Sequence, residues 1–261
     1  MVATIPNTDV KQKDADHAVV VAVTTRAVFE SGAEDGDGED VYGMGVAFPL
    51  LQALQRVNER LLEENPAESL LFDVVLIATD SQQQQQSSRI ISSTKHYGLE
   101  VSRFFFSSQE DFIESLLQNN VQLFLSADRN EALQASQKGV LSALLDRQLA
   151  QSEQLRVMLC GDAVVRPDAG PAPPSRPAAQ SFSAQLGEMR RRFGALDSPL
   201  SIVMVTSSGD GQSCADALRA LRARGLAVDE AYCLAGAPRS PILALLRPHF
   251  LLSDDVISLE D

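Results

Sequence analysis

The residues best suited to chemistry lie in the C-terminal part of the chain, and their types fit phosphoryl transfer. They are Cys160, Asp162, Thr206, Arg239, Asp254 and Asp255. Transfer of a phosphoryl group requires a nucleophile, a proton donor, a hydroxyl and a cation that hold phosphate oxygens, and carboxylates that hold Mg²⁺. Cys160 could be the nucleophile and Asp162 the proton donor. Thr206 and Arg239 could hold phosphate oxygens, and Asp254 with Asp255 could hold Mg²⁺.

Each of these side chains stands at, or shortly after, the end of an apolar run that predicts a buried strand. The runs are 157–159, 200–205, 231–234 and 250–252, and helices are predicted over 182–193, 214–224 and 242–246. A doubly wound parallel sheet brings successive strand ends to one edge. We therefore expect the six side chains to converge on one crevice.

The N-terminal part of the chain shows the same alternation of strands and helices. Strands are predicted over 18–23, 72–79, 99–106 and 121–125, and helices over 47–64, 111–118 and 131–147. Three pairs of landmarks recur 127 positions apart, namely Thr79 with Thr206, Gly98 with Gly225, and Asp128 with Asp255. A constant offset predicts two similar halves from an internal duplication. The alternative is chance, because any chain of alternating strands and helices contains some residues that recur at similar positions.

We predict a disordered tail over 1–16, an N-terminal half over 17–150, and a C-terminal half over 151–261 with a Pro-rich excursion at about 166–180. The opening strands of the two halves align at an offset of 136, with Thr24 opposite Cys160 and Arg26 opposite Asp162. The first half therefore has a cation where the second has a carboxylate. We expect no catalysis there, although Arg26 could hold an anion.

Composition narrows the classes of partner. The chain has 261 residues, 44% of them hydrophobic and 22% charged, which is typical of a globular protein. A net charge of −13 opposes binding to nucleic acid polymers and anionic membranes. Three cysteines are an odd number and indicate no disulfide framework. Because no apolar run reaches the roughly 20 residues of a membrane span, we expect a cytoplasmic protein.

Several segments together resemble the cytosolic 5′-nucleotidase type I family of the haloacid-dehalogenase (HAD) superfamily. They are Ala47-Phe48-Pro49 with Val57-Asn58, Leu125-Ser126-Ala127-Asp128, Gly161-Asp162-Ala163-Val164, Leu234-Ala235-Gly236-Ala237-Pro238 and Arg247-Pro248-His249. The resemblance implies an α/β fold with HAD-like/Rossmann-like parallel sheets and flanking helices. It also implies Mg²⁺-dependent hydrolysis of nucleoside monophosphates, such as AMP, through an aspartyl-phosphate.

The residue-by-residue match to this family is partial. Asp162 matches the general acid/base beside the metal, Thr206 matches the phosphate-binding hydroxyl, and Asp254 with Asp255 matches the acidic pair at the metal. Cys160 stands where the family has its nucleophilic aspartate, and Arg239 stands where it has lysine. The excursion after Val165 also looks shorter than the family's cap, and the chain ends six residues past Asp255, where the family's chains continue.

Replacement of the nucleophilic aspartate removes both a nucleophile and an oxygen ligand, because thiolate prefers softer metals than Mg²⁺. Our first hypothesis is a nucleotidase-like protein with weak or no hydrolytic activity and a binding or regulatory role. The second is an active Mg²⁺-dependent 5′-nucleotidase in which Asp162 or Cys160 replaces the missing aspartate. The third is an interaction module with a vestigial site, whose partner is another protein or a second copy.

Structural roles remain open for the same residues. Cys160 is interpreted equally well as a small core residue, Asp162 as a turn or helix cap, and Thr206 as the hydroxyl that ends its strand. The three histidines have no metal-ligand spacing, and we interpret them as structural.

Overall fold

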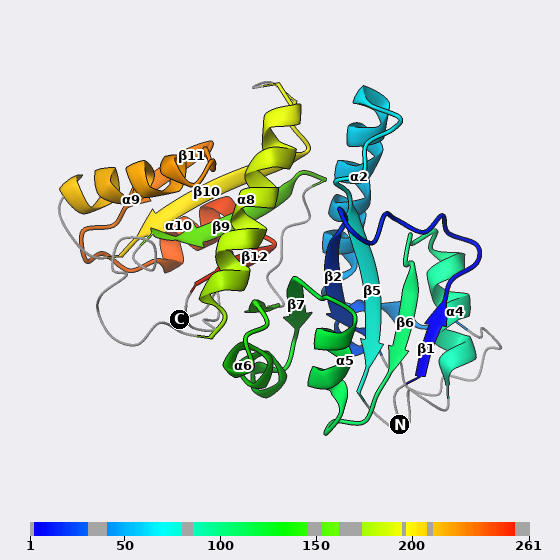
Figure 1. The fold of residues 1–261 in the computed structure, drawn as a ribbon. Helices are drawn as coiled ribbons and strands as arrows, with labels where there is room; N and C mark the ends of the chain where they lie inside the picture. The colour runs from blue at the N-terminus through cyan, green and yellow to red at the C-terminus, as the bar shows by residue number, and fades with distance from the viewer. Residues whose placement is uncertain are drawn as a thin grey trace.

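The computed structural model describes residues 3–30, 41–79, 86–145, 153–161, 174–194, 197–207 and 211–253. The glutamine run at 82–86, apart from Gln86, and the acidic segment from 31 to 40 lie outside these ranges. Within them the protein is an α/β fold with two main sheets of largely parallel strands and flanking helices, as predicted (Figure 1).

The first sheet has the strand order β1-β6-β5-β2-β7-β8. Its strands are β1 (Ala3–Pro6), β2 (Val19–Thr24), β5 (Phe72–Ala78), β6 (Arg103–Phe106), β7 (Leu123–Ser126) and β8 (Ser142–Leu144). All neighbouring pairs are parallel except β1 and β6. Every residue of β2 and β5 is buried, since helices cover both faces of a parallel sheet.

The helices of this half are α1 (Thr25–Val28), α2 (Phe48–Glu64), α4 (Ser87–His96), α5 (Phe112–Gln118) and α6 (Arg129–Gln137). Buried side chains of α2 and α4 pack with Val19, Val21 and Val23 of β2. Those of α5 and α6 pack with Val20 and Ala22, which point to the opposite face. A small hairpin of β3 (Phe29–Glu30) and β4 (Gly43–Met44) lies between α1 and α2 in the chain.

Two predictions for this half are wrong. Residues 3–6 of the supposed disordered tail form β1, which extends the sheet beside β6, and Asn7 Nδ2 donates to Val101 O at 2.8 Å. Backbone pairing, which composition does not reveal, orders this segment. The predicted helix over 131–147 ends at Gln137, because Gly139 has a φ of +90° and the chain continues into β8.

The second sheet has the order β11-β10-β9-β12, and all its pairs are parallel. Its strands are β9 (Leu155–Cys160), β10 (Leu200–Thr206), β11 (Glu230–Cys233) and β12 (Phe250–Leu252). Its helices are α8 (Arg176–Arg192), α9 (Gly211–Ala223) and α10 (Ser240–Leu246). Helix α8 begins inside the predicted Pro-rich excursion, with Pro177 in its first turn, where a missing N–H costs nothing.

The two sheets share a strand order. The strands of the second half, numbered 1 to 4 in chain order, are β9, β10, β11 and β12. They lie side by side as β11-β10-β9-β12, which is the order 3-2-1-4. The corresponding strands of the first half lie as β6-β5-β2-β7. The register also agrees between the first and fourth strands, with Val21 opposite Leu123 and Val157 opposite Phe250. These likenesses support the predicted duplication and the division near residue 150, which stay predictions.

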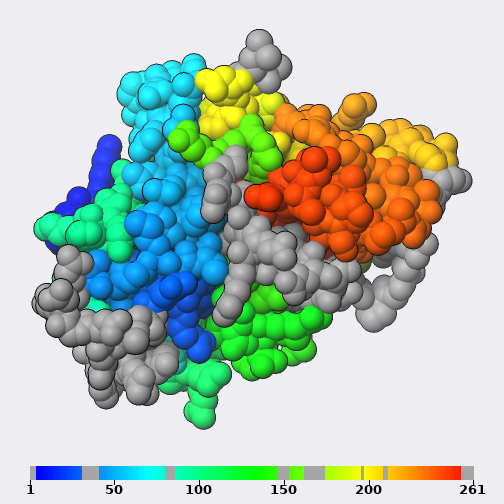
Figure 2. Space-filling model, turned by 180° about the vertical axis from the view of Figure 1, so that it is seen from behind, coloured from blue at the N-terminus to red at the C-terminus, as the bar shows by residue number. Residues whose placement is uncertain are grey.

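The two halves pack directly on each other. One continuous hydrophobic cluster contains buried residues of both sheets, and α2 contacts β9 and α8 in addition to β5. Figure 2 shows the end of α2 (cyan) beside α8 (yellow) on the rear face. Ion pairs join the halves at Arg56 with Glu153 (2.9 Å) and Arg192 with Glu68 (3.7 Å). No helix among the described residues is long and apolar enough to span a bilayer.

Candidate functional site

Cys160 is the last residue of β9, a central strand of the second sheet. Strand β10 flanks β9 on one side, where Cys160 lies opposite Val205, and β12 flanks it on the other. The cysteine is only 5% exposed. Its thiol therefore lies at the carboxyl edge of the sheet, the edge at which parallel α/β folds bind ligands.

Thr206 ends the neighbouring strand β10 and is 1% exposed. Its hydroxyl lies 3.5 Å from the carbonyl oxygen of Tyr232 on β11. Its methyl group packs over Gly161, the residue after Cys160. Cys160 and Thr206 thus stand on adjacent strand ends, as the sequence predicted.

Arg239 reaches the same strand end from the turn before α10. Its Nε donates to Ser207 Oγ at 2.7 Å, and Ser207 directly follows Thr206. The turn between β11 and α10 also contacts this strand end through its backbone. Leu234 N donates to Thr206 O and Gly236 N donates to Ser207 O, both at 2.9 Å. This turn uses left-handed backbone at Ala235 and Gly236, with φ of 49° and 88°. A cation and a hydroxyl therefore lie in contact at the end of β10, directly after Thr206 in the chain.

Ser207 is a residue that sequence reasoning missed. It stood in the run Thr206-Ser207-Ser208-Gly209 at the end of a predicted strand, but a serine after a strand has no distinguishing spacing. Only its contact with Arg239 reveals it as a residue that positions the guanidinium.

The remaining predicted site residues, Asp162, Asp254 and Asp255, lie outside the described residues. Their roles as proton donor and metal ligands stay predictions. In the part of the chain that the structure describes, no three His, Cys, Asp or Glu side chains lie close enough together to hold a metal. At the end of β9 the described side chain is that of Cys160, whose sulfur is a soft ligand and does not fit Mg²⁺, which prefers oxygen.

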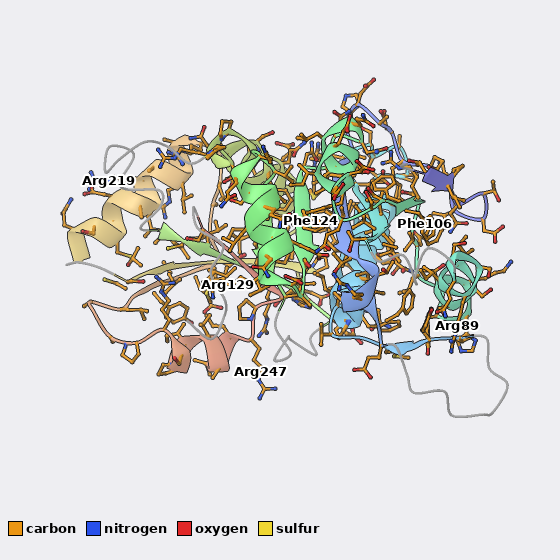
Figure 3. The ribbon with its side chains drawn as sticks, turned by 90° about the horizontal axis from the view of Figure 1, so that it is seen from below. Arg89, Phe106, Phe124, Arg129, Arg219 and Arg247 are labelled. Atoms are coloured by element: carbon orange, nitrogen blue, oxygen red, sulfur yellow. The ribbon has the colours of Figure 1, made fainter. Side chains whose placement is uncertain are left out.

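The Arg247-Pro248-His249 segment has a structural role at the other end of β9. His249 is fully buried, and its Nδ1 accepts the backbone N–H of Arg156 at 3.0 Å. Arg247 has a left-handed backbone, with φ of 44°, and its side chain extends away from the molecule (Figure 3).

The fold and the strand ends define an α/β protein with polar side chains at the carboxyl edge of its second sheet. A family model described as 5′-nucleotidase matches residues 34–172 and 170–261. Human cytosolic 5′-nucleotidase 1B is 34% identical over 244 residues, an alignment that covers 83% of this chain and 40% of the human protein. The chain therefore spans about two fifths of that relative's length. It belongs to the 5′-nucleotidase family, as its sequence resemblance predicted.

Proposed function

We propose that this chain is a cytoplasmic 5′-nucleotidase-like protein that binds phosphate or a nucleoside monophosphate and hydrolyses it weakly or not at all. The observation that carries the proposal is Cys160, which is buried at the end of β9, the position at which the sequence resemblance implies the family's nucleophilic aspartate. A thiol there lacks the oxygen that would bind Mg²⁺ and form the aspartyl-phosphate.

The phosphate-binding side of the site supports retention of a ligand. The Thr206 hydroxyl and the Arg239 guanidinium stand at one strand end, and the Ser207 contact holds the guanidinium there. Arginine keeps the positive charge of the family's lysine and can donate two parallel hydrogen bonds to a phosphate. This half of the machinery would bind the ligand without requiring the missing carboxylate.

The position of the Cys160 thiol at the end of β9 also favours one alternative, an active enzyme with a different nucleophile. In that mechanism the Cys160 sulfur would form a bond to phosphorus while the ester oxygen departs with a proton from Asp162. Water would then give a proton back to Asp162 while its oxygen bonds to phosphorus, which breaks the sulfur–phosphorus bond and releases inorganic phosphate and the thiolate. The other version of this alternative recruits Asp162 in place of the missing aspartate.

The test is release of inorganic phosphate from a panel of nucleoside monophosphates in the presence of Mg²⁺. The natural protein is compared with Cys160→Asp, with Cys160→Asn as the control of equal size without the charge, and with Asp162→Asn. We expect little or no phosphate release by the natural protein, a gain of activity in Cys160→Asp and none in Cys160→Asn. Turnover by the natural protein that Asp162→Asn abolishes would instead establish the alternative.

Binding is measured separately as the rise in unfolding temperature with AMP, since a ligand that binds only the folded state stabilises it by mass action. We expect stabilisation of the natural protein. No stabilisation by any nucleotide or by phosphate would favour an interaction module with a vestigial site.

A further inference from the structure

A second polar cluster stands at the carboxyl edge of the first sheet, around the carboxylate of Glu131. Arg26 Nη2 donates to Glu131 Oε1 at 2.5 Å, and Thr79 Oγ1 donates to the same oxygen at 2.8 Å. Ser126 Oγ donates to Oε2 at 2.6 Å. The glutamate is 1% exposed, whereas the side chain of Arg26 is 42% exposed. Both carboxylate oxygens thus accept hydrogen bonds below the surface.

The donors come from three neighbouring strand ends. Arg26 follows β2, Thr79 follows β5, and Ser126 ends β7. Glu131 is the third residue of α6, whose N-cap Asp128 accepts from the backbone N–H of Asn130 and of Glu131. A negative charge in the first turn of a helix is favourable, because unpaired N–H groups point toward it. The helix start therefore places the carboxylate at the edge of the sheet at which a ligand would bind in this fold.

The cluster corresponds to the candidate phosphate site of the second half. Under the 127-residue offset, Thr79 matches Thr206 and Ser126 matches Ser253. Glu131 matches Ser258, which has no carboxylate. The equal strand order of the two sheets supports this correspondence. The first half thus has side chains that can donate hydrogen bonds to an oxyanion, and it also has a carboxylate that accepts these hydrogen bonds.

We propose that the carboxyl edge of the first sheet is an oxyanion-binding site that the protein fills with its own side chain, the carboxylate of Glu131. A guanidinium and two hydroxyls are the groups that bind the oxygens of phosphate or of a free carboxylate, and a charged acceptor strengthens each of their hydrogen bonds. While Glu131 occupies these donors, the first half takes no phosphate. Removal of the Glu131 side chain should leave a space lined by the same hydrogen-bond donors. Solvent should reach this space beside Arg26, whose side chain is partly exposed.

The test opens this site in a background that disables the other one. Glu131→Ala is made together with Arg239→Ala, so that phosphate bound in the second half does not contribute. Unfolding temperature and calorimetric binding are measured with inorganic phosphate and with acetate, against chloride at equal ionic strength. We expect either anion to raise the unfolding temperature of this variant by several degrees, and phosphate to bind at one site per chain.

Two further variants show where the anion binds. Adding Arg26→Met should abolish the gain, because the cation of the site is lost. Glu114→Ala in the Arg239→Ala background is the matched control: it removes an exposed glutamate from the first turn of α5 and should gain nothing.

A folded Glu131→Ala variant that responds to phosphate and acetate no more than the Glu114→Ala control would overturn the proposal. If Glu131→Ala does not fold in chloride, phosphate or acetate added during refolding should restore the folded protein. Absence of rescue by both anions would equally show that Glu131 is a structural residue and no substitute for a ligand. Neither result depends on hydrolysis, so the proposed function is judged separately.

Discussion

The methyl group of Thr206 occupies the space that a side chain on Gly161 would need. A Cβ at residue 161 would lie 2.6 Å from Thr206 Cγ2 and 3.1 Å from Met204 Sδ, closer than atoms pack without displacement. Gly161 separates Cys160 from Asp162, so this contact joins the ends of β9 and β10 where the predicted chemistry is located. Glycine at this point lets the two strand ends approach.

Gly161→Ala is therefore expected to push β10 away from β9 at the site. We expect a loss of about 1–3 kcal/mol in the free energy of unfolding, as for other overpacked cores, together with weaker phosphate binding. Chemical denaturation measures the first and calorimetry the second. Gly211→Ala is the control, since a Cβ at that helical position meets nothing within 4 Å. Equal stability of the two variants would contradict the close packing of the strand ends.

Asn58 links α2 to the first sheet through both atoms of its amide. Its Nδ2 donates to Phe72 O at 2.8 Å, and its Oδ1 accepts from Phe72 N at 2.7 Å. Asn58→Ala leaves both buried backbone groups unpaired, at a cost of about 1–3 kcal/mol for each. Urea denaturation should show this loss, while Gln52→Ala on the exposed face of the same helix should change stability by less than about 0.5 kcal/mol.

Arg239 should be required for nucleotide binding, and Ser207 should assist it. We expect Arg239→Ala to abolish the rise in unfolding temperature that AMP causes, and Ser207→Ala to reduce it because the guanidinium loses its hydrogen bond. Arg219→Ala is the matched control, since that arginine is exposed on α9, where it pairs with Asp216. An unchanged response in Arg239→Ala would contradict the proposed phosphate contact.

Tyr232 should titrate at higher pH than an ordinary tyrosine. Its hydroxyl donates to the Glu230 carboxylate, which raises the pKa of Tyr232 above its usual 10.0. The folded protein then holds this proton more tightly than the unfolded chain. The resulting stability is present below pH 10 and is lost as the pH rises through the folded pKa.

The chain contains no tryptophan and three tyrosines, so absorbance near 295 nm follows tyrosinate formation directly. Subtracting the titration of Tyr232→Phe from that of the natural protein isolates this residue. Glu230→Gln should bring its pKa back toward 10, because the negative charge is gone. A Tyr232 titration that is the same with and without Glu230 would show that the carboxylate has no influence.

Sequence periodicity was sufficient for the fold class. Apolar runs such as Val19–Val23 and Phe72–Ala78 have the continuous hydrophobicity of doubly covered strands. Apolar residues at helical spacing along Phe48–Glu64 specified the helix that covers these strands. Periodicity failed for Ala3–Pro6, because an edge strand gains its order from backbone hydrogen bonds to β6, which leave no pattern in the side chains.

The sequence by itself determined which chemical groups this protein has at its strand ends, including the cysteine at the end of β9. Those groups follow directly from residue identity and from the position at which each apolar run stops. Only the tertiary structure decided which groups meet. The contacts of Ser207 with Arg239 and of Glu131 with Arg26 and Thr79 join residues far apart in the chain. Such contacts depend on how turns and helix starts aim side chains across a sheet edge, a geometry that no local pattern of residues records.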